Sequence, residues 1–285
     1  MLGAESLGLG YLRVADQVVA PKRGGFHEPL MLLSYLAAIN ERIQMTSSVL
    51  VSPSRQTALL DKQIVELHAL LAGRLRLGLG LGCDPKEYQA MGKSLSRRGY
   101  SLEEQIELFR QLWAGDRINF LLAEERFEGV GISPRPNGGT IPIWIGVSPE
   151  LPVQALERLG RLADGWFTMC RVDQFASQNK VVLESVKRSG RSISDFDVEA
   201  EVSIADLAPD NLISLVKRWQ DLGISHIILS ALGLEGDSSS PLAGVYETGW
   251  MKKGFLKGHL LEIHFWRVSP TCRARPASSS VDRTQ

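Results

Sequence analysis

The clearest chemical signal in the sequence is a glycine and a serine placed directly before a predicted helix. Gly146, Val147 and Ser148 precede Pro149, a residue that favours the first turn of a helix. Backbone N–H groups at a helix start have no partner inside the helix, and with the helix dipole they attract phosphate. The stretch therefore predicts a site for a phosphate-bearing ligand. The alternative is that Ser148 only caps the helix, which uses the same amides.

Two further sets of chemically useful residues follow stretches that alternate like strands. Asp16 and Gln17 come directly after a short run of this kind. Gly80 and Gly82 alternate with leucines in another run, and Cys83 follows at once. A glycine within a strand lets a ligand or another backbone approach closely, or it only eases packing. The sequence leaves both interpretations open for this pair.

Helices and strands alternate along most of the chain, as judged from hydrophobic periodicity and from Gly and Pro boundaries. The predicted strands span residues 11–15, 43–51, 75–81, 141–145, 164–168, 196–204 and 225–230. The predicted helices span residues 30–40, 56–71, 101–114, 149–162, 175–188 and 209–222. A Ser101 to Glu104 capping box is the predicted start of the third helix. Seven short strands separated by helices favour a closed α/β barrel, with a doubly wound open sheet as the alternative.

The barrel interpretation brings the residues named above together. Ligands of α/β barrels bind at the carboxyl ends of the strands, where the stretches after the predicted strands converge on one rim. Residues 117–136 interrupt the alternation as an irregular hairpin or excursion. We therefore expect a barrel domain over residues 1–232. Residues 233–285 form an atypical tail, partly disordered because its last part is poor in apolar residues.

Composition excludes several classes of function. The chain has 32 Lys and Arg against 32 Asp and Glu, so no net charge favours nucleic acid or a membrane surface. No apolar run reaches the roughly 20 residues of a membrane span, and we expect a cytoplasmic protein. Cys83, Cys170 and Cys272 lack the spacing of a zinc site, so we expect no metal. A small-molecule substrate is the remaining expectation.

Several sequence blocks, taken in order, resemble one known family. They are Glu-Arg-Ile-Gln at 41–44, Val-Leu-Val-Ser-Pro at 49–53, Gly-Arg-Leu-Arg-Leu-Gly at 73–78, Arg-Gly at 98–99, Pro-Ile-Trp-Ile-Gly at 142–146 and Ala-Asp-Gly-Trp-Phe at 163–167. Each block alone is weak, because glycine-rich junctions are common. In this order and spacing they resemble the bacterial-luciferase-like family of flavin- or deazaflavin-dependent oxidoreductases, over about residues 4–232.

The resemblance implies a TIM (β/α)8-type barrel. The family barrel opens with a strand, and this chain begins where that strand would already have ended. We therefore expect an incomplete barrel, with its first strand missing and its last helix atypical. Two strand edges would then lack a neighbour. The tail could cover one edge, and a misassigned start codon or a shifted reading frame is the other explanation.

The resemblance also implies a flat tricyclic cofactor on the rim. Ser48-Val49 matches the position where the family often has a non-proline cis peptide that presses the backbone against the ring, with an ordinary β-bulge as the alternative. Gly80 and Gly82 would allow the ring to approach. Gly146, Val147 and Ser148 would hold the cofactor phosphate. The cofactor implied is reduced coenzyme F420, a deazaflavin, or reduced FMN.

Three positions bear on catalysis and on the substrate pocket. Asp16 and Gln17 occupy the place where relatives commonly have Asp-His, and are the expected catalytic pair. Glutamine forms hydrogen bonds but cannot titrate, so general acid–base catalysis would need another group. Cys83 stands where many relatives have Trp, and implies a reshaped substrate pocket. Trp166 either forms a wall of that pocket or fills a layer of the barrel.

The function implied is an oxidoreductase that acts on a small organic substrate by monooxygenation with FMN or by hydride transfer with F420. One alternative is a non-catalytic or degenerate flavin-binding barrel. Another is an unrelated barrel isomerase or lyase acting on a phosphorylated substrate. A homodimer through helices of the first half, including residues 56–71, is also implied by the resemblance.

Overall fold

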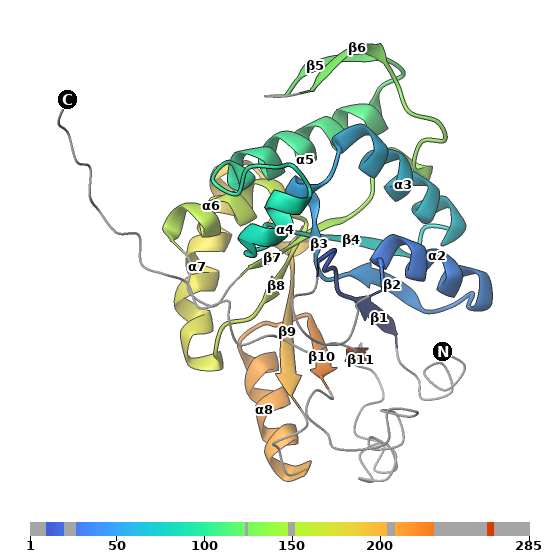
Figure 1. Ribbon diagram of the computed structural model, residues 1–285. Helices are drawn as coiled ribbons and strands as arrows, with labels where there is room; N and C mark the ends of the chain where they lie inside the picture. Colours follow the sequence, from blue (N-terminus) through green and yellow to red (C-terminus); the bar gives the residue numbers. More distant parts are fainter. Residues whose placement is uncertain are drawn as a thin grey trace, which may run out of the picture.

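The computed structural model shows an α/β barrel with helices around a central parallel sheet (Figure 1). It describes residues 10–19, 27–122, 125–147, 152–203, 209–230 and 261–264. The strands of the main sheet are β1 (Tyr11–Val14), β2 (Gln44–Ser47), β3 (Leu50–Val51), β4 (Leu75–Gly80), β7 (Ile143–Val147), β8 (Gly165–Thr168), β9 (Asp197–Ser203), β10 (His226–Ser230) and β11 (Leu261–His264).

The strand pairings run in a closed circuit. The sheet order is β2-β1-β11-β10-β9-β8-β7-β4-β3, and β2 also pairs with β4. Each of these pairings is parallel. The predicted α/β barrel is confirmed, and the doubly wound open sheet is wrong, because a doubly wound sheet has two free edges.

The neighbour of β1 and β10 in this circuit is β11, which comes from the C-terminal segment. Ile227 of β10 pairs with Leu261, and Tyr11 of β1 pairs with Glu262. The strand therefore lies in the place that the resemblance gives to a barrel's first strand, and it pairs on both sides rather than covering one edge. The sequence predicted no strand there, because residues 249–268 lack sustained periodicity. The predicted domain boundary near residue 232 falls outside the described residues.

Helices surround the sheet in Figure 1, and a hairpin stands apart from them. The helices are α2 (Pro29–Ile39), α3 (Thr57–Leu70), α4 (Pro85–Ala90), α5 (Arg98–Ala114), α6 (Val153–Leu162), α7 (Val172–Arg188) and α8 (Pro209–Asp221). The hairpin consists of β5 (Ile118–Leu121) and β6 (Arg126–Val130), which confirms the predicted excursion. A 3₁₀ turn, η1 (Ser52–Ser54), joins β3 to α3.

Three predicted helix starts are wrong, and one of them is that of α7, which begins at Val172 and not at residue 175. Helix α5 begins at Arg98, so Ser101 lies inside the first turns and the predicted capping box does not form. Helix α6 begins at Val153 after Pro152 as N-cap, and not at Pro149. Proline favours a first turn wherever one begins, so Pro149 and Pro152 compete for this role and the sequence alone does not choose between them.

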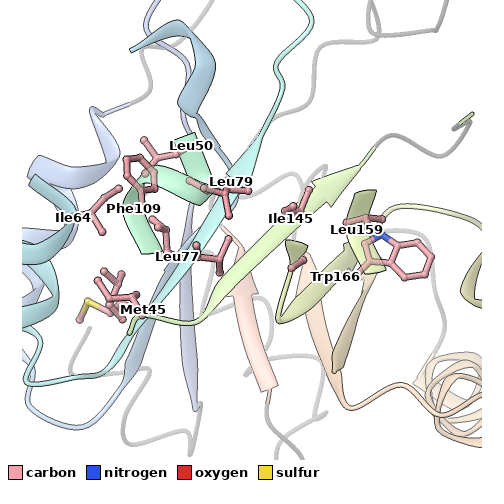
Figure 2. Packing of buried hydrophobic residues seen from close by; sticks show 14 of the residues in the cluster. Met45, Leu50, Ile64, Leu77, Leu79, Phe109, Ile145, Leu159 and Trp166 are labelled. Atoms are coloured by element: carbon pink, nitrogen blue, oxygen red, sulfur yellow. The ribbon is translucent and has the colours of Figure 1, made fainter. Parts of the chain in front are cut away.

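The apolar core lies between the sheet and the helices. Figure 2 shows Leu77 and Leu79 of β4 beside side chains of the surrounding helices, such as Ile64 of α3 and Phe109 of α5. Successive side chains of a strand point to opposite faces, so the leucines of β4 face the helices and Arg76 faces the barrel interior. The alternation of leucine with arginine and glycine in this strand follows from that geometry.

Candidate functional site

The carboxyl ends of β2, β3, β4 and β7 form a mouth built around a cis peptide bond. The Ser48–Val49 bond is cis, as the resemblance implies. A Cβ placed on Gly80 would lie 2.2 Å from Val49 Cγ2, and one placed on Gly146 would lie 2.5 Å from Val49 Cγ1. No real Cβ tolerates such contacts, so both positions must be glycine for Val49 to lie where it does. The mouth therefore contains a cis peptide bond, and the valine of this peptide packs against two glycines.

Hydrogen bonds fix the strand that carries this peptide. Ser47 Oγ donates to the carbonyl of Gly78 at 2.8 Å and accepts from its N–H at 3.1 Å. A Cβ on Gly78 would lie 1.8 Å from the Ser47 carbonyl oxygen, so this close approach also requires glycine. Gly82 has φ of +60°, a conformation that favours glycine, and packs against Val51. The glycines in β4 and just after it thus allow β2, β3 and the residues between them to pack closely against β4.

Asp16 links the end of β1 to the turn after β3. Its Oδ2 accepts from the N–H of Val51 at 2.9 Å, and its Oδ1 accepts from Arg55 Nη2 at 2.8 Å. Only 1% of the Asp16 side chain is exposed. Burial raises the pKa of Asp16, opposed by the charge of Arg55 and by both hydrogen bonds. Both carboxylate oxygens are thus engaged in contacts with the segment after β3, and the expected catalytic role of Asp16 stays a prediction.

Gln17 follows on the rim and is half-buried. No hydrogen bond of its side chain is found within the described part of the chain. The next residue, Val18, donates its N–H to Glu87 Oε1 of α4 at 2.7 Å. Burial raises the pKa of Glu87, with the Val18 hydrogen bond acting the other way. The segment after β1 is thereby anchored on both sides of Gln17, and Gln17 itself stays at the edge of the mouth.

The amino-terminal half of the barrel interior contains a buried network of charged and aromatic side chains. Arg13 Nη1 of β1 donates to Glu199 Oε1 of β9 at 2.7 Å, and Arg76 Nη1 of β4 lies 3.6 Å from Glu199 Oε2. The Arg76 guanidinium also lies over the rings of Tyr11 and Trp144, at 4.1 and 4.0 Å from their centroids. These residues come from distant strands of the sheet, so they meet only across the interior.

His226 completes this network. Its Nε2 lies 3.1 Å from Arg76 Nη2 and its Nδ1 lies 2.9 Å from Ser225 Oγ. Burial lowers the pKa of His226 to about 4, and the positive charge of Arg76 acts in the same direction. A neutral imidazole can accept the Arg76 hydrogen bond at Nε2 while Nδ1 carries its proton. The histidine is therefore held neutral, inside the packed end of the barrel.

Glu201 is the inward-facing residue next to Glu199 on the mouth side, and sequence reasoning missed it. Its Oε2 lies 4.0 Å from Arg13 Nη2, across the interior from β9 to β1. The Glu201 side chain is 22% exposed, against 0% for Glu199. Asp197, Glu199 and Glu201 occupy every second position of β9. That run of acids on one face of a predicted barrel strand is the signal that could have identified it.

Comparison with known proteins agrees with this geometry. The sequence model of a family described as luciferase-like monooxygenase matches residues 1–206. The chain belongs to the luciferase-like monooxygenase family. The F420-dependent glucose-6-phosphate dehydrogenase of Nocardia farcinica is 29% identical over 248 residues, covering 81% of this chain and 72% of that protein. An uncharacterized protein of Mycobacterium tuberculosis is 30% identical over 72% of this chain and 67% of its own length.

Solved structures of this luciferase-like fold superpose on the chain. An F420-dependent secondary alcohol dehydrogenase, solved with an F420-acetone adduct, has a TM-score of 0.70 at 14% identity, over 80% of this chain and 86% of that one. The monooxygenase RslO1 from Streptomyces bottropensis has a TM-score of 0.65 at 20% identity, over 76% of this chain and 67% of that one. At these identities the likeness shows the fold.

The two residues expected in the substrate pocket of this luciferase-like barrel lie in different surroundings. Cys83 is exposed just beyond β4. Trp166 is completely buried and stacks on Phe175 of α7, with 5.7 Å between ring centroids, in the apolar layer drawn in Figure 2. It therefore fills the layer between sheet and helices and does not form a wall of the mouth. Trp144, by contrast, faces the interior, where it lies beside Arg76 and His226.

The phosphate stretch is only partly described. Gly146 and Val147 end β7 and are half-buried, whereas Ser148 lies outside the described residues. The N-cap of α6 is Pro152, so the described start of this helix lies beyond the predicted Ser148 cap. A role of this stretch toward phosphate therefore stays a prediction.

A cleft lies beside η1. Its lining residues are Pro53, Arg55, Thr57, Lys93, Ser94, Arg97, Ser101, Glu104, Gln105, Leu122 and Glu125. Glu125, from the hairpin, accepts hydrogen bonds from Gln56 Nε2 at 3.1 Å and from Thr57 Oγ1 at 3.0 Å. Glu125 also accepts from the N–H of Thr57, so the chain's own carboxylate satisfies the start of α3. No group of three or more His, Cys, Asp or Glu within the described part of the chain could hold a metal ion.

No helix among the described residues is both long and apolar enough to span a membrane.

Proposed function

We propose that this protein is an oxidoreductase that binds a reduced deazaflavin, coenzyme F420, or the flavin FMN at the mouth of its barrel and acts on a small organic substrate. The observation that carries the proposal is the packing of Val49 against Gly80 and Gly146 at the carboxyl ends of the strands. When bound, F420 supplies a hydride acceptor or donor, and reduced FMN supplies a group that reacts with oxygen.

The residues of the mouth fit a flat ring. Ser48 and Val49 offer peptide backbone and methyl groups, and two glycines beneath them leave no larger side chain. The Ser47 and Gly78 hydrogen bonds and the Asp16 contact to Val51 hold this surface in place on both sides. The protein's contribution is then to hold and orient the ring and to exclude water, as it is for cofactor enzymes generally.

The cofactor phosphate belongs, in this proposal, to Gly146, Val147 and Ser148 at the end of β7. Gly146 supports this assignment, because it lies in β7 near its carboxyl end and packs against Val49, which belongs to the proposed ring surface. Free backbone N–H groups after a strand are the ordinary protein partners of phosphate. We also propose a cytoplasmic location, because other enzymes of the cell must regenerate the form of the cofactor that this reaction consumes.

F420 is the cofactor that the relatives favour. Both the Nocardia farcinica protein and its counterpart from Mycolicibacterium fortuitum, 28% identical over 78% of this chain, are named F420-dependent. On this basis we propose hydride transfer as the reaction. Neither the fold nor these relatives favours the non-catalytic alternative, although Gln17 requires that another residue handle the proton.

A binding titration tests the proposal. Purified protein is titrated with oxidised F420 and, separately, with FMN, and binding is followed by quenching of cofactor fluorescence. We expect saturable binding of F420 with one site per chain. Binding of FMN alone would redirect the proposal to a monooxygenase that uses oxygen. Binding of neither ring would contradict it.

A second copy of the chain is the partner that we propose for one surface. Met31, Tyr35 and Ile39 recur at helical spacing on α2 and are 72%, 65% and 46% exposed. Leu59 and Leu70 of the adjacent α3 are 58% and 59% exposed. Such a patch can face its own copy across a two-fold axis. Light scattering should give the mass of a dimer for the wild type and of a monomer for a Met31→Glu, Tyr35→Glu variant; a wild-type monomer would contradict the proposal.

A further inference from the structure

The inference concerns Glu201, and it rests on the proposed function. Glu201 lies on β9 two positions after Glu199, so both face the barrel interior. The contact of Glu201 with Arg13 confirms this orientation, because β1 and β9 are separated in the sheet by β10 and β11. Glu201 is the member of the pair on the mouth side, toward the carboxyl end of the strand.

Glu199 and Glu201 differ in burial and in how closely they contact arginine. Glu199 is completely buried, and its two oxygens lie 2.7 Å from Arg13 Nη1 and 3.6 Å from Arg76 Nη1. Glu201 makes one looser contact, 4.0 Å to Arg13 Nη2, and 22% of its side chain is exposed. Glu199 is thus committed to the internal network, whereas Glu201 is held near the mouth by charge without a short hydrogen bond to Arg13.

The other ionisable groups near the mouth are engaged elsewhere. Asp16 is bound to Val51 and Arg55, and Glu87 is bound to the N–H of Val18. Gln17, at the position where relatives have histidine, cannot take up or release a proton. Among the residues whose side chains the structure describes, which do not include those of β11, Glu201 is therefore an inward-facing ionisable group at the carboxyl ends of the strands that solvent or a substrate can reach.

We propose that Glu201 is the residue that exchanges a proton with the substrate, with Arg13 as its positioning residue. In the oxidising direction, with a secondary alcohol as substrate and the deazaflavin in its oxidised form, the C–H bond breaks and its hydrogen leaves with the electron pair to the deazaflavin. The O–H bond of the hydroxyl group on the same carbon also breaks, and its proton moves to a carboxylate oxygen of Glu201. The carbon–oxygen double bond forms. Glu201 then releases the proton to water. In the reverse direction the protonated carboxyl donates it to the forming hydroxyl.

Arg13 explains why the carboxylate stays at this position. Its guanidinium lies between the two glutamates, at 2.7 Å from Glu199 and 4.0 Å from Glu201. It also faces the ring of Phe167 from β8, 5.3 Å away. On the β10 side, the register neighbour of Glu201 is Ile228, which carries no charge. Arg13 thus places a positive charge beside the Glu201 carboxylate and orients it.

The test uses Glu201→Gln and Glu201→Asp with Glu184→Gln as matched control. Glu184 lies on α7, is 58% exposed and is 4.0 Å from Lys180, so it shares the charge of Glu201 but not its place. F420 binding is measured first by fluorescence. The absorbance of bound, oxidised F420 is then followed against pH, because a carboxylate beside the ring disfavours ionisation of the ring's own hydroxyl. Turnover is measured with 2-propanol and with glucose 6-phosphate as probes.

We expect Glu201→Gln to bind F420 as the wild type does, and to shift the absorbance transition of the bound ring to lower pH. We expect its kcat with the probe that the wild type turns over to fall about 100-fold or more, with little change in KM. Glu201→Asp should restore part of kcat, and Glu184→Gln should match the wild type in every readout.

The outcomes separate the two proposals. A wild type that binds neither F420 nor FMN contradicts the proposed function, and with it the role of Glu201. A wild type that binds F420, with a Glu201→Gln variant whose bound-ring absorbance and kcat are unchanged, contradicts the role of Glu201 alone. Loss of F420 binding in Glu201→Gln, with Glu201→Asp equally affected, would assign Glu201 to cofactor binding instead.

Discussion

The two ends of the barrel interior are built from the same strands and in opposite ways. At the amino end, inward positions carry large side chains such as Arg76, Trp144 and His226, and all three are buried. At the carboxyl end, β4 and β7 place Gly80 and Gly146 at the inward positions, and the nearest side chain over each is that of Val49, between β2 and β3.

This difference indicates that charged side chains inside the barrel have two separate roles. The Arg13, Arg76 and Glu199 cluster is buried and internally paired, so it belongs to the structure of the barrel. Glu201 extends the same line of acids on β9 to the mouth, where it is partly exposed. One strand therefore carries a structural carboxylate and a carboxylate available for chemistry two residues apart. In α/β barrels this division between a stabilising and a functional end is general.

The largest effect on stability is expected at the amino end. Glu199→Gln removes the charge that two buried arginines face at 2.7 and 3.6 Å. Breaking a buried ion pair by removing one partner typically costs about 3–5 kcal/mol. We expect a loss of this size in the free energy of unfolding, measured by chemical denaturation. Glu184→Gln, at an exposed pair, should cost no more than about 1 kcal/mol. Equal losses in the two variants would contradict a structural role for the cluster.

A buried carboxyl in the helix layer should affect stability but not the mouth. Asp61 of α3 is fully buried and accepts a hydrogen bond from Trp113 Nε1 of α5 at 2.8 Å. Burial raises the pKa of Asp61 to about 7, and the Trp113 hydrogen bond opposes the rise. Since the folded state holds this proton more tightly than the unfolded state, its contribution to stability is lost as pH rises from about 4 to about 7.

The Asp61→Asn variant keeps an oxygen for Trp113 and removes the titration. The loss in the wild type amounts to about 1.4 kcal/mol per pH unit within that window, an upper limit for one group. The variant should therefore gain stability over the wild type as pH rises from 4 to 7, and lose that advantage below pH 4. Denaturation at several pH values measures this, with F420 affinity as the control that must not change. A pH-independent difference between the two proteins would be evidence against a titrating Asp61.

At the mouth, substitution of a glycine should affect stability and binding together. The added methyl group of Gly80→Ala would lie 2.2 Å from Val49, so the cis peptide segment must shift. Overpacking of this kind typically costs about 1–3 kcal/mol. We expect that loss together with weaker F420 binding. Gly115→Ala is the matched control, because the nearest atom to its new methyl group lies at 3.4 Å. Unchanged F420 affinity in Gly80→Ala would contradict a role of this glycine in cofactor binding.

The smallest effect is expected for Trp166→Phe. The ring stacks on Phe175 in the helix layer, and its Nε1 has no hydrogen-bond partner in the described structure. A smaller aromatic ring keeps the stacking and removes the unpaired donor. We expect a change in unfolding free energy below about 1.5 kcal/mol and the same F420 affinity as the wild type. A marked loss of F420 affinity would return Trp166 to the pocket.

Much of the fold could be predicted because it depends on local patterns. Seven strands and the helices between them follow from alternation and from Gly and Pro boundaries, and the alternation of leucine with arginine and glycine predicted β4. The cis Ser48–Val49 bond came from the family resemblance, since no local pattern of residues specifies it. Helix α4 and strand β11 were missed because each is short and lacks a periodic signal.

The site was harder to predict because its contacts are distant in sequence. Arg13 and Glu199 are 186 residues apart, and Asp16 and Arg55 are 39 apart. Nothing near Asp16 indicates that its carboxylate is engaged by a residue after β3, so a catalytic role was the natural expectation. For the same reason Glu201 was overlooked: its importance depends on which residues the closed barrel brings to face it.

The central claim is that the Ser48–Val49 peptide, Gly80 and Gly146 form the surface that holds the deazaflavin ring. A crystal structure of the protein with oxidised F420 tests it most directly. The account predicts electron density for the ring against the Ser48–Val49 backbone, with the Glu201 carboxylate facing the substrate side of the ring. Ring density in the cleft lined by Arg55, Lys93 and Arg97, or at any site away from Val49, would contradict it.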